Sequence, residues 1–258
     1  MRDKDYIDSE LEQIQEDLIT LRSTLRSIKL KGMILNETKE TVQIITFAST
    51  NRKTGDMAQV WILNKNINPV QAFKNGESEK ICFDCPHLKN KTCYVNVGQA
   101  PQQVYKAYKA GKYSPLDLNV LKVALKWKAV RFGAYGEPVL IPLHLVQFIA
   151  RYSKGYTGYT HQWRNLEFLE YRAYFMASAD IAGDVTEAHA MGWRTFRVKG
   201  SEQPNLDHEI DCPNALTGVQ CRDCKLCHGL GAHGNGKSIT VIVHGTQGKI
   251  NKFNAINL

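Results

Sequence analysis

The pattern of apolar positions divides the chain near residue 31. In the first thirty residues, apolar side chains recur at alternating steps of four and three, the heptad spacing of a coiled coil. These positions are Ile7, Leu11, Ile14, Leu18, Leu21, Leu25 and Ile28. Such a seam is narrower than the apolar face of most helices that pack on their own domain, which is the alternative. We expect residues 1–31 to form an oligomerisation helix and the protein to be a homo-oligomer through residues 7–28.

From residue 41 onward, short apolar runs alternate with helical stretches. Strands are expected at 41–48, 58–63, 130–134, 155–160, 173–177, 193–198 and 238–244. Helices are expected at 101–110, 116–127, 143–152 and 185–191. Alternation of this kind favours a mainly parallel sheet. We therefore predict that residues 41–258 form an α/β domain, a (β/α) barrel of the TIM type that is open or incomplete, because right-handed crossovers let consecutive strands curl toward closure.

Composition narrows the class of protein. The chain has 258 residues, of which 43% are hydrophobic and 22% charged, which excludes a disordered or collagen-like chain. The net charge of +8 suits a nucleic acid or a phosphorylated small molecule as partner. No run approaches the roughly 20 apolar residues of a membrane span, and the N-terminus is too acidic for a signal peptide. We expect a cytoplasmic protein with no membrane partner.

Seven cysteines carry the most specific chemical signal. They are odd in number and fall into two tight groups, so metal ligation explains them better than disulfides do. The later group lies in the loop 212–228 with the spacing C-x8-C-x2-C-x2-C, and consists of Cys212, Cys221, Cys224 and Cys227. This spacing resembles ferredoxin loops, in which proline follows the remote cysteine, as Pro213 does here. It favours a [4Fe–4S] cluster, with zinc as the alternative.

The earlier group, in the loop 81–98, consists of Cys82, Cys85 and Cys93. Three thiols leave a four-coordinate site one ligand short. One interpretation is a zinc site completed by His87 or by a cysteine of the other group. The other is an iron–sulfur cluster with one open iron, able to hold a substrate or cofactor.

The order of motifs resembles that of radical S-adenosylmethionine enzymes over residues 58–200. A three-cysteine loop follows one strand, and Gly136-Glu137-Pro138 ends the next. The family's usual spacing is C-x3-C-x2-C, whereas this chain has C-x2-C-x7-C. The resemblance implies that Cys82, Cys85 and Cys93 bind a [4Fe–4S] cluster with one open iron. It also implies that Gly136 and Glu137 contact S-adenosylmethionine.

A second resemblance, over residues 80–245, is to phage proteins of the gene product 88 type. The shared segments are Cys93-Tyr94, Tyr159-Thr160 with Trp163-Arg164, Ser178-Ala179-Asp180, Gly192-Trp193-Arg194, and Cys212-Pro213 through Cys227. The activity of that family is not established, and related phage reading frames are labelled replication-associated. The resemblance implies a phage protein acting in the host cytoplasm.

Four polar residues follow expected strands, where α/β barrels place their chemistry: Glu137, His161, Asp180 and His244. Asp180 and His161 are the catalytic candidates; the alternative for each is a polar residue that only ends a strand. Tyrosines and lysines also interleave over residues 105–113, which suits stacking on single-stranded nucleic acid or an ordinary surface helix.

Two functions follow from these observations. The first is an iron–sulfur enzyme, resembling radical S-adenosylmethionine enzymes, that acts on a nucleotide or nucleic acid. The second is a nucleic-acid-binding or replication-associated phage protein without catalysis, in which zinc or iron–sulfur sites only stabilise loops.

Overall fold

The computed structural model describes residues 9–16, 30–230 and 236–257. The chain divides into two units, residues 1–31 and 32–258. In the first unit, residues 9–16 are helical. Most of the expected heptad seam over residues 7–28 lies outside the described residues, so the coiled coil stays a prediction.

The second unit begins with a mixed five-stranded sheet in the order β1-β2-β3-β4-β5. The strands are β1 (Gly32–Glu37), β2 (Thr41–Thr46), β3 (Ala58–Asn64), β4 (Val130–Tyr135) and β5 (Tyr156–Thr157). The first three pair antiparallel, and β3, β4 and β5 pair parallel. Every residue of β2 and β3 is buried, because other elements cover both faces of the sheet centre.

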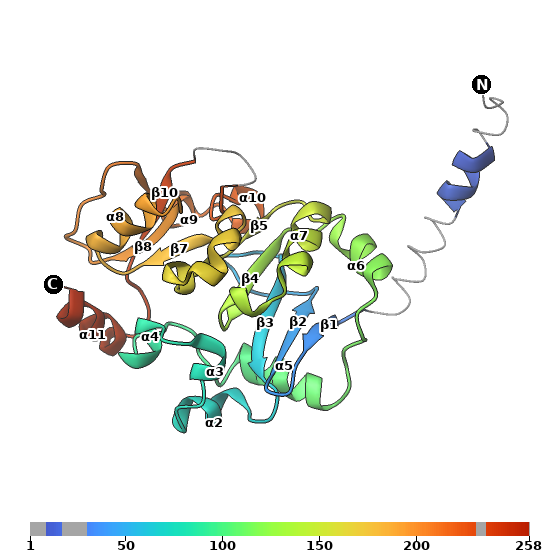
Figure 1. Ribbon diagram of the computed structural model, residues 1–258, viewed down its shortest axis with the longest axis horizontal. Coiled ribbons are helices and arrows are strands. Elements are labelled where there is room, and N and C mark those ends of the chain that lie inside the picture. Colours follow the sequence, from blue (N-terminus) through green and yellow to red (C-terminus); the bar gives the residue numbers. More distant parts are fainter. Residues whose placement is uncertain (1–8, 17–29, 231–235, 258) are drawn as a thin grey trace. The chain divides into compact units, whose positions relative to one another are not determined.

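The second sheet is entirely parallel, in the order β6-β7-β8-β10-β9. Its strands are β6 (Tyr159–Thr160), β7 (Met176–Ala179), β8 (Thr195–Lys199), β9 (Glu209–Asp211) and β10 (Ser238–Ile242). The chain passes from the first sheet to the second between β5, which is labelled in Figure 1, and β6. Gly158 separates these strands, and its N–H donates to the carbonyl of Cys227 at 2.8 Å instead of joining a ladder.

The barrel prediction is wrong. The α/β class holds, but the described residues form two open sheets, with edge strands β1 and β5 in the first and β6 and β9 in the second, and no closed ring of strands. Two features account for the difference. The first three strands are joined antiparallel, and the carbonyl of Cys227 interrupts the ladder at Gly158. Strand–helix alternation reports parallel pairing but carries no information about closure.

Short helices connect and cover the strands. The α-helices are α2 (Pro69–Lys74), α3 (Glu79–Cys82), α4 (Pro86–Lys89), α5 (Ala100–Lys109), α6 (Leu118–Leu125), α7 (Leu143–Tyr152), α8 (Ala182–Ala190), α9 (Pro213–Thr217), α10 (Cys221–Cys224) and α11 (Gln247–Asn257). The 3-10 helices are η1 (Pro138–Leu140), η2 (Gln162–Arg164) and η3 (Leu166–Ala173). Within the described residues, no helix is long and apolar enough to cross a bilayer.

The core continues across both sheets. Phe132 on β4 packs against Phe175 just before β7, with ring centroids 5.3 Å apart. Trp163 is fully buried, and its indole N–H donates to the carbonyl of Ser178 at 2.9 Å. These contacts hold the ends of β4, β6 and β7 in fixed relation, and those ends carry the candidate site.

Candidate functional site

The three cysteines of the earlier group lie in the segment that follows β3. Cys82 ends α3, Cys85 precedes α4, and Cys93 follows α4. Backbone bonds hold the loop, with the Cys85 N–H donating to the carbonyl of Cys82 and the Cys93 N–H to that of His87, both at 3.1 Å. Burial raises the pKa of the Cys82 thiol well above its usual range, and Cys85 and Cys93 raise it further. A bound cation would favour the thiolate forms and offset the cost of burying their negative charge.

The carboxyl ends of β4 and β6 bring Glu137 and His161 to this loop. The Glu137 N–H donates to the carbonyl of Ile81 at 2.7 Å. Its carboxylate accepts from the Thr160 hydroxyl at 2.5 Å and from the backbone N–H of His161 at 3.1 Å. The His161 ring places Nδ1 3.5 Å from Sγ of Cys85 and 3.5 Å from Oε1 of Glu137. Glu137 thus positions His161 against the cysteine loop.

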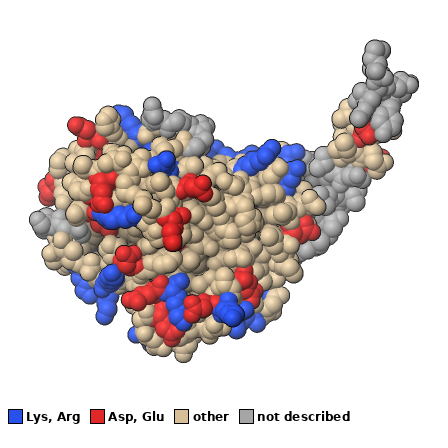
Figure 2. Space-filling view, viewed as in Figure 1, with Lys and Arg blue, Asp and Glu red and all other residues tan. Residues whose placement is uncertain are grey.

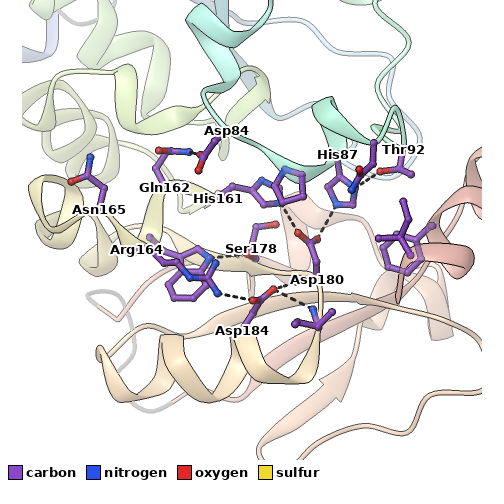
Figure 3. A pocket seen from close by; sticks show the side chains of 16 residues that line it. Asp84, His87, Thr92, His161, Gln162, Arg164, Asn165, Ser178, Asp180 and Asp184 are labelled. Atoms are coloured by element: carbon purple, nitrogen blue, oxygen red, sulfur yellow. Dashed lines mark hydrogen bonds and ion pairs between the residues drawn. The ribbon is translucent and has the colours of Figure 1, made fainter. Parts of the chain in front are cut away.

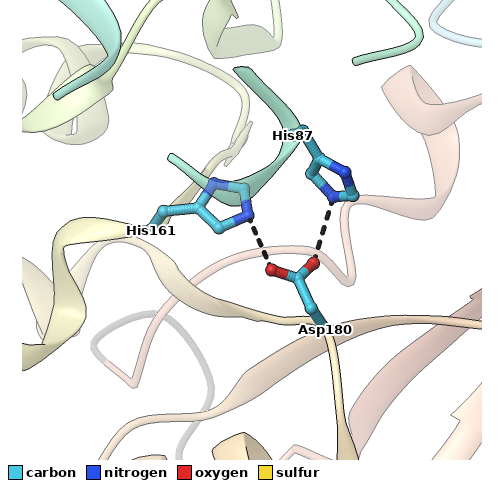
Figure 4. Close-up of side chains that lie close together, drawn as sticks. All are labelled: His87, His161 and Asp180. Carbon is cyan, nitrogen blue, oxygen red and sulfur yellow. Dashed lines mark ion pairs between the residues drawn. The ribbon is translucent and has the colours of Figure 1, made fainter. Parts of the chain in front are cut away.

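Asp180 follows β7 and faces two imidazoles (Figure 4). Its carboxylate oxygens lie 3.0 Å from Nε2 of His87 and 3.5 Å from Nε2 of His161. Although burial alone would raise the pKa of Asp180, the two histidines hold it well below its usual range. Burial lowers the pKa of His161, but Asp180, Cys85 and Glu137 outweigh that effect and raise it well above 6.5.

These side chains border a cavity of about 530 Å³. Figure 3 shows His87 and His161 directed at Asp180, and Arg164 directed at Asp184, along its wall. Helix α11 lies beside α4 (Figure 1), and the ring of Phe253 stacks on His87 with centroids 6.1 Å apart. The cavity therefore has a polar wall of ionisable groups and an apolar wall from the C-terminal helix.

Gly136 is explained by local packing. Its φ is +80°, and a Cβ there would lie 2.8 Å from both Cβ and the carbonyl oxygen of Ile62 on β3. Only glycine adopts this conformation at so close an approach without strain. The turn thus requires Gly136 whether or not S-adenosylmethionine binds, and its cofactor role stays a prediction.

The later cysteine group is assembled from the segment after β9. The Cys212 N–H donates to the carbonyl of Thr240 at 2.8 Å, and the Cys221 N–H to that of Lys53 at 2.9 Å. Burial raises the pKa of Cys227, and the other three cysteines of the group raise it further: Cys212, Cys221 and Cys224. All seven cysteines are free thiols, partly buried in the structure. The fold brings these four together, as it does the earlier three.

A buried arginine holds the loop around the later group. Arg194, only 5% exposed, donates to four backbone carbonyls at 2.6–3.1 Å. They belong to Leu226, His228, Gly236 and Lys237. The structure therefore uses this guanidinium within the protein. Sequence reasoning missed this contact because backbone acceptors leave no residue-type signal.

A tyrosine pair and an arginine connect the two groups. Tyr94 follows Cys93, and its hydroxyl lies 3.1 Å from that of Tyr159 and accepts from Arg131 at 2.8 Å. Burial opposes the charge on Arg131, but Tyr94 and Tyr159 raise its pKa above the usual value, and Cys221 adds to this. Arg131 on β4 thus interacts with residues of both cysteine segments.

Two further sequence candidates lie away from His161 and Asp180. His244, beyond β10, contacts the ring of Tyr94 with centroids 5.6 Å apart. In the tyrosine–lysine helix, Tyr105 is buried in the core, and Tyr108 and Tyr113 are partly buried against it. These rings do not form the exposed stacking surface that single-stranded nucleic acid needs.

One interpretation of the sequence made His87 the fourth ligand of a zinc site with the three earlier cysteines. The structure turns its Nε2 toward Asp180 and its Nδ1 toward the hydroxyl of Thr92 at 2.8 Å. Only tertiary contact reveals this pairing, since Asp180 is remote in sequence.

Compared with protein-family models, with curated proteins and with solved structures, the chain matches none of them, so its function rests on the geometry described above.

Proposed function

We propose that this protein is an iron–sulfur enzyme of the radical S-adenosylmethionine kind. In this proposal Cys82, Cys85 and Cys93 bind a reactive [4Fe–4S] cluster with one open iron, and the later four cysteines bind a second, structural cluster. The observation that carries it is the meeting of three free, partly buried thiols with Glu137 and His161 at the carboxyl ends of parallel strands.

The sequence spacing of the later thiols supports a cluster over a single zinc ion, because C-x8-C-x2-C-x2-C resembles the cysteine spacing of ferredoxin loops. Zinc sites built from cysteines more often use two separate C-x2-C pairs. A cluster of several irons spans a wider set of sulfurs than one ion does.

When bound, such a cluster supplies one electron to a small molecule held at its open iron. The chain's own residues would orient that molecule. His161 faces Cys85 and can donate from Nδ1 to its sulfur, an interaction that tunes the potential of an iron–sulfur cluster. The cavity beside Asp180 gives the substrate room, and the apolar side chain of Phe253 helps to exclude water from it.

Glu137 retains capacity for the S-adenosylmethionine ammonium group. A carboxylate offers about four lone-pair sites; Thr160 and the backbone N–H of His161 use two, and the His161 ring faces a third, with Nδ1 3.5 Å from Oε1. An ammonium could therefore share the carboxylate without displacing either donor. The nucleic-acid-binding alternative has weaker support: on the face drawn in Figure 2, lysines and arginines are interspersed with acidic side chains.

The test begins with iron, acid-labile sulfide and zinc analysis of protein purified without oxygen. We expect about four irons and four sulfides for each cluster, two clusters per chain, and little zinc bound by thiols. Cys85→Ser should lose the first cluster and Cys224→Ser the second, so each variant serves as the control for the other.

Activity separates the enzyme from a merely metal-stabilised protein. Dithionite-reduced wild type mixed with S-adenosylmethionine should release methionine and 5′-deoxyadenosine, and Cys85→Ser should release none. Stoichiometric zinc without sulfide would reject the iron–sulfur assignment. Intact clusters with no S-adenosylmethionine binding by calorimetry would leave an iron–sulfur protein of another kind.

A further inference from the structure

We infer that His87, His161 and Asp180 form a separate binding site for a single divalent transition-metal ion, distinct from both cysteine groups. Their ligand atoms all lie within 4.8 Å of one another, and each residue is partly buried. The set of two imidazoles and one carboxylate is typical of sites that bind zinc or non-haem iron(II).

Three different strands and helices deliver these ligands. His87 comes from α4, His161 follows β6, and Asp180 follows β7. Figure 4 shows both imidazoles directing a nitrogen at the carboxylate between them. Convergence of ligands from segments remote in sequence onto one point requires the folded core, which makes the site rigid.

The hydrogen bonds around the trio leave it short of partners. Nε2 of His161 and Oδ1 of Asp180 are fully buried and form no hydrogen bond of good geometry among the described residues; their nearest polar neighbours lie within the trio, Oδ2 of Asp180 at 3.5 Å and Nε2 of His87 at 3.0 Å respectively. Nε2 of His161 lies 3.5 Å from Oδ2 of Asp180, and a divalent cation between the nitrogen and the carboxylate would be a shared partner for both.

The outer contacts match those of metal-binding histidines. His87 Nδ1 lies 2.8 Å from the Thr92 hydroxyl, and His161 Nδ1 lies 3.5 Å from the Glu137 carboxylate. Such partners fix the tautomer that directs Nε2 at a metal. The backbone of Asp180 is also fixed, because its N–H donates to Oδ2 of Asp184 at 2.8 Å.

The position of the trio suits catalysis better than structural stabilisation. Structural zinc sites have four protein ligands, whereas catalytic sites keep a position open for water or substrate. Here three ligands border the cavity of about 530 Å³. A molecule in that cavity with an oxygen or nitrogen donor could therefore complete the coordination sphere.

The alternative is a purely electrostatic group in which one protonated histidine pairs with Asp180. Zinc counting on full-length protein, with its cysteine sites as purified, distinguishes the two. Protein is equilibrated with Zn²⁺, separated from free ion and analysed for zinc and sulfide. The variants are His87→Gln and Asp180→Asn, with His144→Gln as the matched control because His144 is exposed on α7.

We expect wild type and His144→Gln to hold one zinc per chain more than His87→Gln and Asp180→Asn, with sulfide equal in all four. Zn²⁺ should raise the thermal midpoint of wild type but not of either site variant. A cooperative thermal transition in each variant shows that it folds. Equal zinc in all four proteins would overturn the proposal. Loss of sulfide together with zinc would also overturn it, since these residues would then only support the cysteine site.

A triple variant separates this inference from the proposed function. Replacing Cys82, Cys85 and Cys93 with serine should remove the first cluster and keep the zinc that depends on Asp180. If wild type holds no sulfide, the iron–sulfur proposal fails, and the zinc difference between wild type and Asp180→Asn still decides this site.

Discussion

The two cysteine groups share a ligand type and differ in what surrounds them. Beside the earlier group lie ionisable side chains, with His161 3.5 Å from Cys85, and His161 in turn lines the cavity. Around the later group, backbone predominates: carbonyls of Lys53 and Thr240 accept from its cysteines, and Arg194 holds its loop through four carbonyls. Reactive chemistry needs titratable neighbours and access, whereas a structural site needs only a fixed loop.

The largest expected effect tests the structural role of the later group. Arg194→Met removes a buried guanidinium and leaves four carbonyls without their donor, which costs roughly 3 kcal/mol. For a domain of this size the thermal midpoint should fall by roughly 5–10 °C. Iron should be lost from the later group before the earlier one. Arg194→Met combined with Cys85→Ser reports the iron of the later group, and Arg194→Met combined with Cys224→Ser reports that of the earlier group.

Arg222→Met is the matched control, because Arg222 belongs to the same loop and its guanidinium forms exposed ion pairs with Asp56 and Asp223. Its midpoint should change little, since such pairs contribute under about 1 kcal/mol. Equal shifts for the two arginine variants would contradict the role assigned to Arg194.

A second prediction concerns the junction that joins the later group to the sheets. A Cβ at Gly158 would lie 2.8 Å from the ring of Phe175, so Gly158→Ala should destabilise the protein by about 2 kcal/mol. The hydrogen bond from the Gly158 N–H to the Cys227 carbonyl would shift with the backbone. Gly183→Ala is the control, because its Cβ meets nothing closer than 3.7 Å and alanine favours helix α8. Thermal unfolding of both variants checks this; a stable Gly158→Ala would mean that the junction is loosely packed.

A third prediction sharpens the role of the earlier group. Glu137→Gln keeps the size of the side chain but removes the charge that would attract an ammonium group. The dissociation constant for S-adenosylmethionine should rise at least about tenfold, or ~1.4 kcal/mol, with iron and sulfide unchanged. Calorimetry measures it. Unchanged affinity would restrict Glu137 to holding Thr160 and His161.

The smallest effect on the folded domain is expected from removing residues 1–31. Both cysteine groups lie within residues 32–258, so iron per chain should not change. If the heptad seam drives assembly, the number of chains per particle should fall, as measured by light scattering. An unchanged number of chains would contradict the oligomerisation helix.

Much of the local structure followed from the residues. Strands near 41–46, 58–64 and 130–135 and helices near 101–109 and 143–152 were expected from periodicity, and the structure contains them. The grouping of the cysteines also followed, because spacings of two residues hold side chains near one another in any compact loop. Strands β1 and β9 and helices α2 and α11 were not expected, since they are short or weakly patterned.

What the sequence by itself determined is the chemistry available: seven thiols in two groups, and Glu137, His161 and Asp180 each placed just after a strand of α/β structure. Only the tertiary structure decided that the sheets stay open and that His87 pairs with Asp180. The physical reason is range. Periodicity and spacing act over a few residues, whereas sheet edges and side-chain convergence depend on packing between segments far apart along the chain.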